Sequence, residues 1–192
     1  LAVIQWLASF QVSAGQTAAG KPIASTNADI AEREWRQWRG PWMTGVAPDS
    51  DPPQRWSESE NVAWKADIKG LGHSTPIVSG DHVFITYARA VGPKFEPRPD
   101  TAPGAHDNKL VSSRFEFVAA AYDRNSGDLR WEKVLHAAIP HEGAHISASL
   151  ASASPVTDGK RVWFCFGSYG LYCLDFDGNT LWRRDLGRMD TK

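Results

Sequence analysis

The run His141-Glu142-Gly143-Ala144-His145 is the clearest candidate for chemistry, because it matches the pattern H-E-x-x-H. On a helix, this spacing places two imidazoles on one face around a zinc ion, with the glutamate as the general base of a metalloprotease. Pro140 precedes the run and Gly143 lies inside it, so no amphipathic helix is expected here. We therefore interpret His141, Glu142 and His145 as a chance match on a loop, and we expect no metal site and no catalytic residue.

One alternative for this loop stays open. His136 lies a few residues before the run, so that three histidines cluster in one short stretch. Imidazoles are common metal ligands and titrate near neutral pH. A loop carrying His136, His141 and His145 would bind a metal adventitiously or line the mouth of the fold.

Cys165 and Cys173 are the only cysteines of the chain. They are not adjacent and form no C-x-x-C pair, which excludes a zinc site built from thiolates. They flank a predicted hairpin around Ser168-Tyr169, and an oxidising compartment would allow a bridge between them. Cross-strand geometry is often poor for a disulfide, so buried free thiols are the default and the bridge remains an alternative.

Two aspartate-rich stretches, 123–127 and 175–179, resemble the start of a calcium loop. An EF-hand loop needs a bidentate glutamate at its twelfth position, where this chain has Val134 and Leu186. Neither side chain ligates calcium. Aspartate, asparagine and glycine at this density are typical of tight turns, so both stretches are predicted to be hairpin turns.

The elements that position these residues repeat along the chain. Residues 76–85 align without gaps with residues 155–164, each as a short strand, a glycine turn and a second strand. Residues 120–131 align with 172–182, each as a strand that ends in aspartate, a glycine turn and a strand that ends in tryptophan. The unit is four short antiparallel strands, which is one propeller blade. The sequence predicts an all-β, incomplete β-propeller with about two to three blades present.

Tryptophan occupies a fixed place in this unit. The chain has nine tryptophans, and Trp64, Trp131 and Trp182 each end a predicted unit. A blade must stack on its neighbours to bury both faces, and a flat indole between two blades offers both apolar area and an N–H donor. We predict that these three tryptophans are equivalent and buried at blade junctions, as structural blade-docking residues. The intervening stretches 88–116, which holds four of the chain's prolines, and 136–147 are predicted to be inserted loops.

The first residues of the chain suggest export. Residues 1–10 are mostly apolar and carry no charge, and small residues follow at Val12-Ser13-Ala14. This pattern is typical of the end of a signal peptide, and the alternative is a buried strand or helix at a domain edge. We predict a signal-peptide remnant at 1–14, a linker or arm at 15–34, and the N-terminal part of a propeller domain at 35–192. A periplasmic or secreted location follows, with no transmembrane segment in the mature chain.

The balance of basic and acidic residues bears on whether the chain binds nucleic acid. The chain has 21 basic and 22 acidic residues, so it offers no electrostatic support for nucleic-acid binding.

The pattern Asp-x-x-(x)-Gly-x-Leu-x-Trp resembles the tryptophan-docking repeat of the pyrroloquinoline-quinone (PQQ) dehydrogenase propellers and of BamB. With Trp38–Pro41, Ala153–Gly159 and Cys173–Gly178, the chain is most similar to the exported PQQ-like repeat proteins of planctomycete-type bacteria. The resemblance covers about residues 35–187, and it leads us to expect that the chain is an N-terminal fragment of such a protein.

The resemblance also bears on cofactors. The PQQ enzymes hold their cofactor with two adjacent cysteines, an acidic calcium ligand and a catalytic aspartate. This chain has no adjacent cysteines, so no cofactor-binding residue can be assigned to it and no cofactor is predicted.

The expected function is a non-catalytic scaffold for a protein or other macromolecular partner, because loops on a rigid scaffold usually carry function. The alternative is a PQQ-dependent oxidoreductase, similar to alcohol or sugar dehydrogenases. Its site, with PQQ and calcium, would be completed by blades beyond Lys192. Whether the protein is an enzyme stays open, and the non-catalytic role is favoured.

Overall fold

The computed structural model describes residues 2–3, 34–47, 50–97 and 107–190. The described chain is all-β, as predicted, with one short 3₁₀ turn, η1 (Gly167–Tyr169). Its strands are β1 (Ala2–Val3), β2 (Ala66–Asp67), β3 (Ile77–Ser79), β4 (His82–Val91), β5 (Arg114–Asp123), β6 (Leu129–Ala138), β7 (Val156–Thr157), β8 (Arg161–Cys165), β9 (Leu171–Asp175) and β10 (Thr180–Arg184). The predicted signal-peptide remnant at 1–14 and the arm at 15–34 lie outside the described residues, apart from β1 and residue 34.

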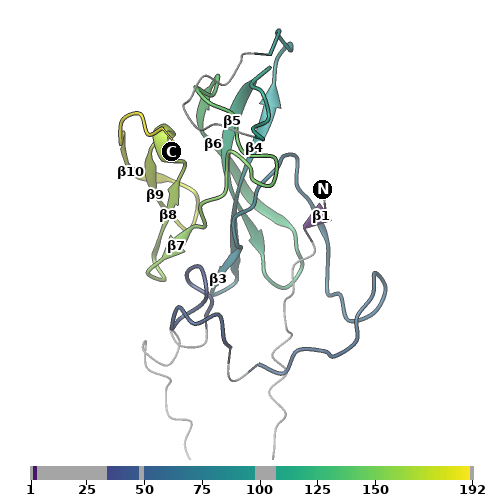
Figure 1. The fold of residues 1–192 in the computed structure, drawn as a ribbon. Coiled ribbons are helices and arrows are strands. Elements are labelled where there is room, and N and C mark those ends of the chain that lie inside the picture. Colours follow the sequence, from purple (N-terminus) through teal and green to yellow (C-terminus); the bar gives the residue numbers. More distant parts are fainter. Residues whose placement is uncertain (1, 4–33, 48–49, 98–106, 191–192) are drawn as a thin grey trace, which may run out of the picture.

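The strands form two four-stranded antiparallel sheets, one for each sequence repeat. The first sheet has the order β3-β4-β5-β6 and the second has β7-β8-β9-β10, so each is a simple meander. The two sheets lie side by side, and the first is much the taller (Figure 1). Strand β1 pairs with β2 in a separate two-stranded sheet.

The register of the strands matches the gapless alignment of the repeats. Ile77 lies opposite Phe84 in the first sheet, and Val156 lies opposite Trp163 at the aligned positions of the second. An irregularity precedes each fourth-strand tryptophan, since the register shifts before Trp131 and again before Trp182. The two sheets are therefore copies of one backbone pattern.

Alternating side chains bury both faces of the first sheet. One face packs against the second sheet, with Phe84 and Phe117 meeting Phe164 and Leu174, all fully buried. The opposite face packs against the segment that contains β2, with Val83, Tyr87 and Val118 among its buried residues and Trp64 and Ile68 against them. This burial stabilises the sheet stack chiefly by removing apolar area from water.

The predicted boundaries of the first insertion are wrong. Strands β4 and β5 stay paired out to Val91 and Arg114, so the connection runs only from 92 to 113 instead of from 88 to 116. The prolines begin only at Pro93, and the Arg89 guanidinium pairs across the ladder with the Glu116 carboxylate, Nε to Oε2 at 2.7 Å. The pairing of β4 with β5 therefore continues beyond Ala88 and Glu116.

The fourth strand also departs from the prediction. Strand β6 continues through His136 to Ala138, so Trp131 lies near its start and the second insertion begins later than predicted. Trp182 likewise lies in the middle of β10. The strand does not end at the tryptophan because the ladder with the preceding strand continues beyond it.

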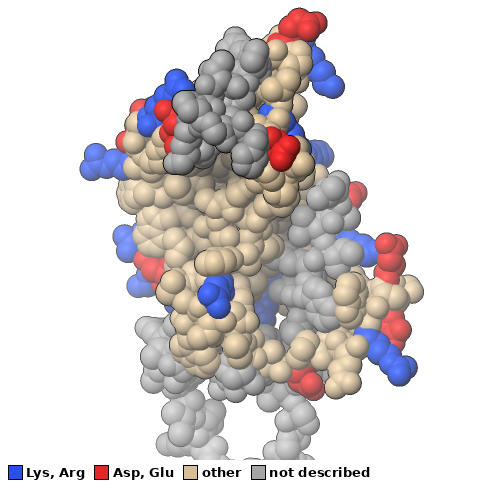
Figure 2. Space-filling model, in the orientation of Figure 1, with Lys and Arg blue, Asp and Glu red and all other residues tan. Residues whose placement is uncertain are grey.

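The described surface carries mixed charge. Acidic and basic side chains are interspersed around the face in view, with a broad uncharged area between them (Figure 2). Among the described residues there is no helix of the length and hydropathy that crossing a membrane requires.

Candidate functional site

Two tryptophans contact the turn of the next unit in the same way. Trp64 Nε1 donates a hydrogen bond to the Arg124 carbonyl oxygen at 2.9 Å, and Trp131 Nε1 donates to the Phe176 carbonyl oxygen at 2.8 Å. Arg124 and Phe176 each follow the aspartate that ends the third strand of a sheet. Trp131 thus reaches from β6 of the first sheet to the turn after β9. Trp64, which precedes β2, reaches the corresponding turn after β5.

A glycine in each turn makes room for the ring. A Cβ added to Gly127 would lie 2.5 Å from Trp64 Cδ2, and one added to Gly178 would lie 2.9 Å from Trp131 Cδ2. Both glycines have positive φ, +78° and +84°, which other L-residues adopt only with strain. The repeated glycine therefore serves both the turn and the tight contact with the indole.

Trp182 differs in its surroundings. It lies opposite Cys173, on the face of the second sheet that points away from the first sheet. Its side chain is 40% exposed, as is Val156 at 39% on the same face, so the predicted burial of Trp182 is wrong. The physical reason is that no described strand follows β10 to supply a covering turn.

Residues 34–36, here called the strap, join the first strands of the two sheets. The Trp35 carbonyl oxygen accepts a hydrogen bond from Val78 N at 2.8 Å, and the Arg36 carbonyl oxygen accepts one from Thr157 N at 3.0 Å. Val78 in β3 and Thr157 in β7 are aligned positions of the two repeats. The strap therefore satisfies edge-strand donors that would otherwise be unpaired.

Glu34 anchors the strap to the first hairpin. Its carboxylate accepts hydrogen bonds from Ser79 Oγ and from Gly80 N, both at 2.7 Å. Burial opposes the charge, but the hydrogen bonds from Ser79, Gly80 and Arg36 outweigh it and hold the pKa of Glu34 below its ordinary value. Glu34 could not be found from the sequence, because nothing in the local pattern relates it to a hairpin 45 residues away.

The extended end of the first sheet carries an apolar pocket. It encloses about 100 Å³ between the two insertions, with Leu71, Leu110, Phe115 and Leu150 among its lining residues. Leu110 is 51% exposed at its rim. Backbone pairing holds the insertions together, with Lys109 N donating to the Ala144 carbonyl oxygen at 2.9 Å.

The H-E-x-x-H run lies on an irregular loop, with no helix around it. His141 and Glu142 lie together, with His141 Nε2 3.7 Å from Glu142 Oε1. His145 takes a different place: its Nδ1 lies 2.7 Å from Ser147 Oγ, and its backbone bridges to Asn108. The third group beside His141 is instead the carboxylate of Asp190, again with 3.7 Å from Nε2 to Oδ1. Sequence reasoning missed Asp190, which carries no local signal.

The aspartates of the two turns accept hydrogen bonds from backbone amides of the same turns. Asp123 Oδ1 accepts hydrogen bonds from Asn125 N and Ser126 N, and Asp175 Oδ1 accepts one from Asn179 N. The hydrogen bond from Arg130, followed by those from the turn amides, holds the pKa of Asp123 well below its ordinary value. These carboxylates act as turn residues, in line with their predicted role.

Cys165 and Cys173 are both free thiols. Cys165 lies opposite Leu171 and Cys173 lies opposite Trp163, so the two cysteines are displaced by two residues along the ladder instead of directly opposed. Burial raises the pKa of the Cys173 thiol. The two thiols are thus separate side chains on adjacent strands.

The two sheets, stacked as copies of one unit, define an incomplete β-propeller. A family model described as outer membrane protein assembly factor BamB matches residues 98–191, which include β5 to β10. This match supports a PQQ-like repeat family for the chain, as predicted. No curated protein matches the chain significantly.

The residues of this chain do not fit PQQ in the way that the dehydrogenases bind it. The two cysteines lie on different strands, eight positions apart, and form no adjacent pair. The carboxylates of the aspartates that end β5 and β9 already accept hydrogen bonds from backbone amides of their turns. The described residues therefore provide no cofactor-binding set of that kind.

Proposed function

We propose that this chain is part of a non-catalytic scaffold: an exported propeller of PQQ-like repeats that presents loops to a protein partner. The observation that carries the proposal is the contrast between the repeated residues and the inserted ones. The repeated residues are engaged in turns and in packing between sheets, whereas the insertions leave apolar side chains exposed at one end of the first sheet.

In this proposal Trp64, Trp131 and Trp182 are structural residues that dock successive blades. The same donor, the same acceptor position and the same glycine recur at Trp64 and Trp131. Trp182 lies at the matching place of the second sheet. The turn of a following blade would cover it.

The presenting surface is the extended end of the first sheet. Strands β4, β5 and β6 have ten residues each, against five in β8, β9 and β10, so they lift the insertions beyond the second sheet (Figure 1). Ile146 and Leu110 are 58% and 51% exposed there, beside the apolar pocket. Exposed apolar groups around a pocket suit a protein partner that inserts an apolar side chain.

Export belongs to the same proposal. The apolar, uncharged segment at the start of the chain, with small residues after it, supports passage through a membrane as a signal peptide and hence a periplasmic or secreted scaffold. The resemblance to the exported planctomycete-type repeat proteins points the same way.

A titration with PQQ and calcium separates the scaffold from the oxidoreductase alternative. Tryptophan fluorescence follows binding, and reduction of an artificial dye follows oxidation of alcohols or sugars. The scaffold proposal expects neither saturable binding nor turnover from the purified full-length protein. Tight saturable binding together with turnover would make the oxidoreductase the correct function.

The presenting surface is tested by placing a photo-reactive residue at Leu110, with Lys160 on the second sheet as the control position. The protein cross-linked from Leu110 in the source cells is then purified and its affinity measured. Leu110→Lys should weaken this binding at least about tenfold, with little change for Lys160→Glu. Equal cross-linking from both positions, or equal affinities of both variants, would contradict the assignment of this surface.

A further inference from the structure

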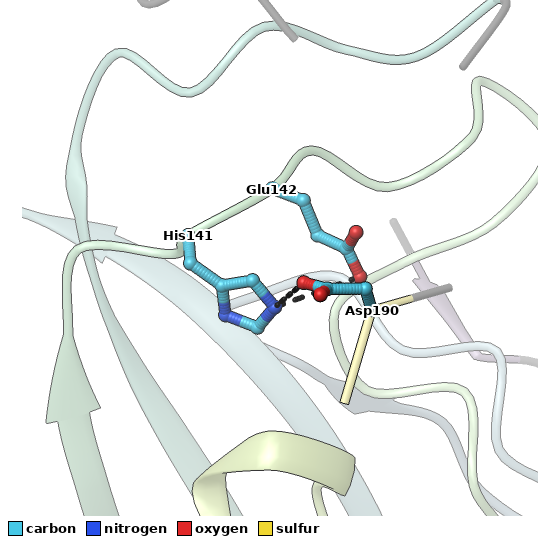
Figure 3. A group of neighbouring side chains, drawn as sticks. All are labelled: His141, Glu142 and Asp190. Carbon is cyan, nitrogen blue, oxygen red and sulfur yellow. Dashed lines mark ion pairs between the residues drawn. The ribbon is translucent and has the colours of Figure 1, made fainter. Parts of the chain in front are cut away.

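Three side chains converge where the second insertion meets the segment after β10. His141, Glu142 and Asp190 each offer one ligand atom, and these atoms all lie within 4.8 Å of one another (Figure 3). The imidazole and the two carboxyl groups point toward a common space (Figure 3). Zinc holds such nitrogen and oxygen ligands at 2.0–2.2 Å, which separates tetrahedral ligands by about 3.5 Å. The two 3.7 Å separations from His141 Nε2 need little change to reach that geometry.

A backbone oxygen points to the same place. The Met189 carbonyl oxygen lies 3.2 Å from His141 Nε2. Ser168 fixes the backbone of Met189 through two hydrogen bonds. Its Oγ accepts from Met189 N at 2.7 Å and donates to the Met189 carbonyl oxygen at 2.9 Å. A fourth oxygen donor is therefore already oriented toward the cluster.

The other nitrogen of the imidazole has a suitable partner. Tyr169 Oη lies 3.1 Å from His141 Nδ1 and also accepts a hydrogen bond from His141 N. The Tyr169 ring stacks on Phe117 of the buried core, with centroids 4.3 Å apart. A metal-bound histidine usually donates its second N–H to such a partner, which fixes the ring and its tautomer. Tyr169 can accept from Nδ1 while Nε2 faces the metal.

We propose that His141, Glu142 and Asp190 form a zinc site, with the Met189 carbonyl oxygen as a fourth ligand. One nitrogen with several oxygens suits zinc or a similar transition metal better than calcium or magnesium, which take oxygen ligands alone. The ion joins the insertion of the first sheet to the segment that leaves the second sheet. It thereby acts as a structural clip between two blades. This site differs from the H-E-x-x-H pattern, because Asp190 takes part and His145 does not.

The Arg188 guanidinium competes with a metal ion for the Asp190 carboxylate. Arg188 Nε donates to Asp190 Oδ1 at 2.8 Å, so the metal must share or displace this ion pair. Replacing Arg188 by glutamine should therefore strengthen zinc binding. A purely structural role of Asp190 offers no reason for such a gain.

The test is calorimetric titration of the metal-free full chain with zinc chloride. One ion per chain is expected, with affinity weakened more than about tenfold by Glu142→Gln or Asp190→Asn and about tenfold by Tyr169→Phe. His145→Gln is the matched control, because it alters the sequence pattern and leaves the spatial cluster intact. Circular dichroism verifies that each variant folds.

Each outcome decides the proposal. Loss of affinity in Glu142→Gln and Asp190→Asn, with His145→Gln unchanged, supports the site. No saturable binding, or binding that these two variants leave intact, overturns it. A loss in His145→Gln as large as that in Glu142→Gln, without a loss in Asp190→Asn, overturns it in favour of an H-E-x-x-H site.

Discussion

Replacing Gly178 by alanine should displace the Trp131 indole from the turn on which it rests. The new Cβ would lie 2.9 Å from Cδ2 of the ring and within 3.2 Å of two further ring atoms. The turn has φ +84° at this position, so alanine also adds backbone strain. Gly80→Ala is the matched control: Gly80 has φ +56°, and an added Cβ meets nothing within 4 Å.

The magnitudes follow from these contacts. The left-handed backbone conformation should lower the free energy of unfolding of each variant by about 1 kcal/mol. Moving the indole removes the hydrogen bond to Phe176, worth about 1 kcal/mol, and part of the ring's burial, worth about 1–2 kcal/mol. Gly178→Ala should therefore lower the free energy of unfolding by about 2–3 kcal/mol more than Gly80→Ala does. Each glycine-to-alanine replacement also lowers the conformational entropy of the unfolded chain. This effect is the same in both variants, so it cancels in the difference between them.

Urea unfolding followed by far-UV circular dichroism measures these differences, provided that the slopes agree between variants. A double-mutant cycle isolates the contact. When Trp131 is already alanine, adding Gly178→Ala should cost no more than Gly80→Ala. Two results would show that the turn does not act through Trp131. One is that Gly178→Ala and Gly80→Ala lower the free energy of unfolding equally when Trp131 is present. The other is that Gly178→Ala lowers it by the full amount even when Trp131 is replaced by alanine.

Three further predictions use other parts of the molecule. Trp131→Ala should destabilise the chain by about 3 kcal/mol or more, and Trp182→Ala by clearly less, because its indole is partly exposed; equal losses in urea unfolding would contradict this difference. Because the pKa of Glu34 is lowered in the folded state, its stabilising effect is fully present above its ordinary pKa and is lost as pH falls through the folded value. Glu34→Gln should therefore flatten the loss of stability below pH 4.5, the ordinary pKa of this group, and an unchanged acid profile would refute the role of Glu34 in the strap. Cys165 should be alkylated faster than the fully buried Cys173 in the native protein; equal labelling of the two peptides in mass spectrometry would contradict this difference in burial.

The local part of the fold could be predicted from the sequence. The hairpin at Gly80 and the turn at Gly178 require positive φ, and glycine in these places marks them. The repeated spacing of strand, aspartate, glycine and tryptophan then predicts four-stranded units and the equivalent places of Trp131 and Trp182. These features depend on residues close together in the sequence.

The rest depends on contacts between distant residues. The pairing of Arg89 with Glu116, which lies inside the extended ladder of β4 and β5, spans a long connection. The strap bonds to β3 and β7 through backbone atoms, which leave no residue pattern. Asp190 meets His141 only because the segment after β10 folds back past Ser168. Patterns of neighbouring residues could not reveal these contacts.

Hydrogen exchange of the indole N–H groups tests the docking of successive units most directly. In the folded chain, the Nε1–H of Trp64 and of Trp131 should exchange slowly, because each is bonded to a turn carbonyl of the following unit. The Nε1–H of Trp182 should exchange much faster, since its side chain is 40% exposed. If nuclear magnetic resonance shows Trp131 exchanging as fast as Trp182, the units are not docked through their tryptophans and the central claim is wrong.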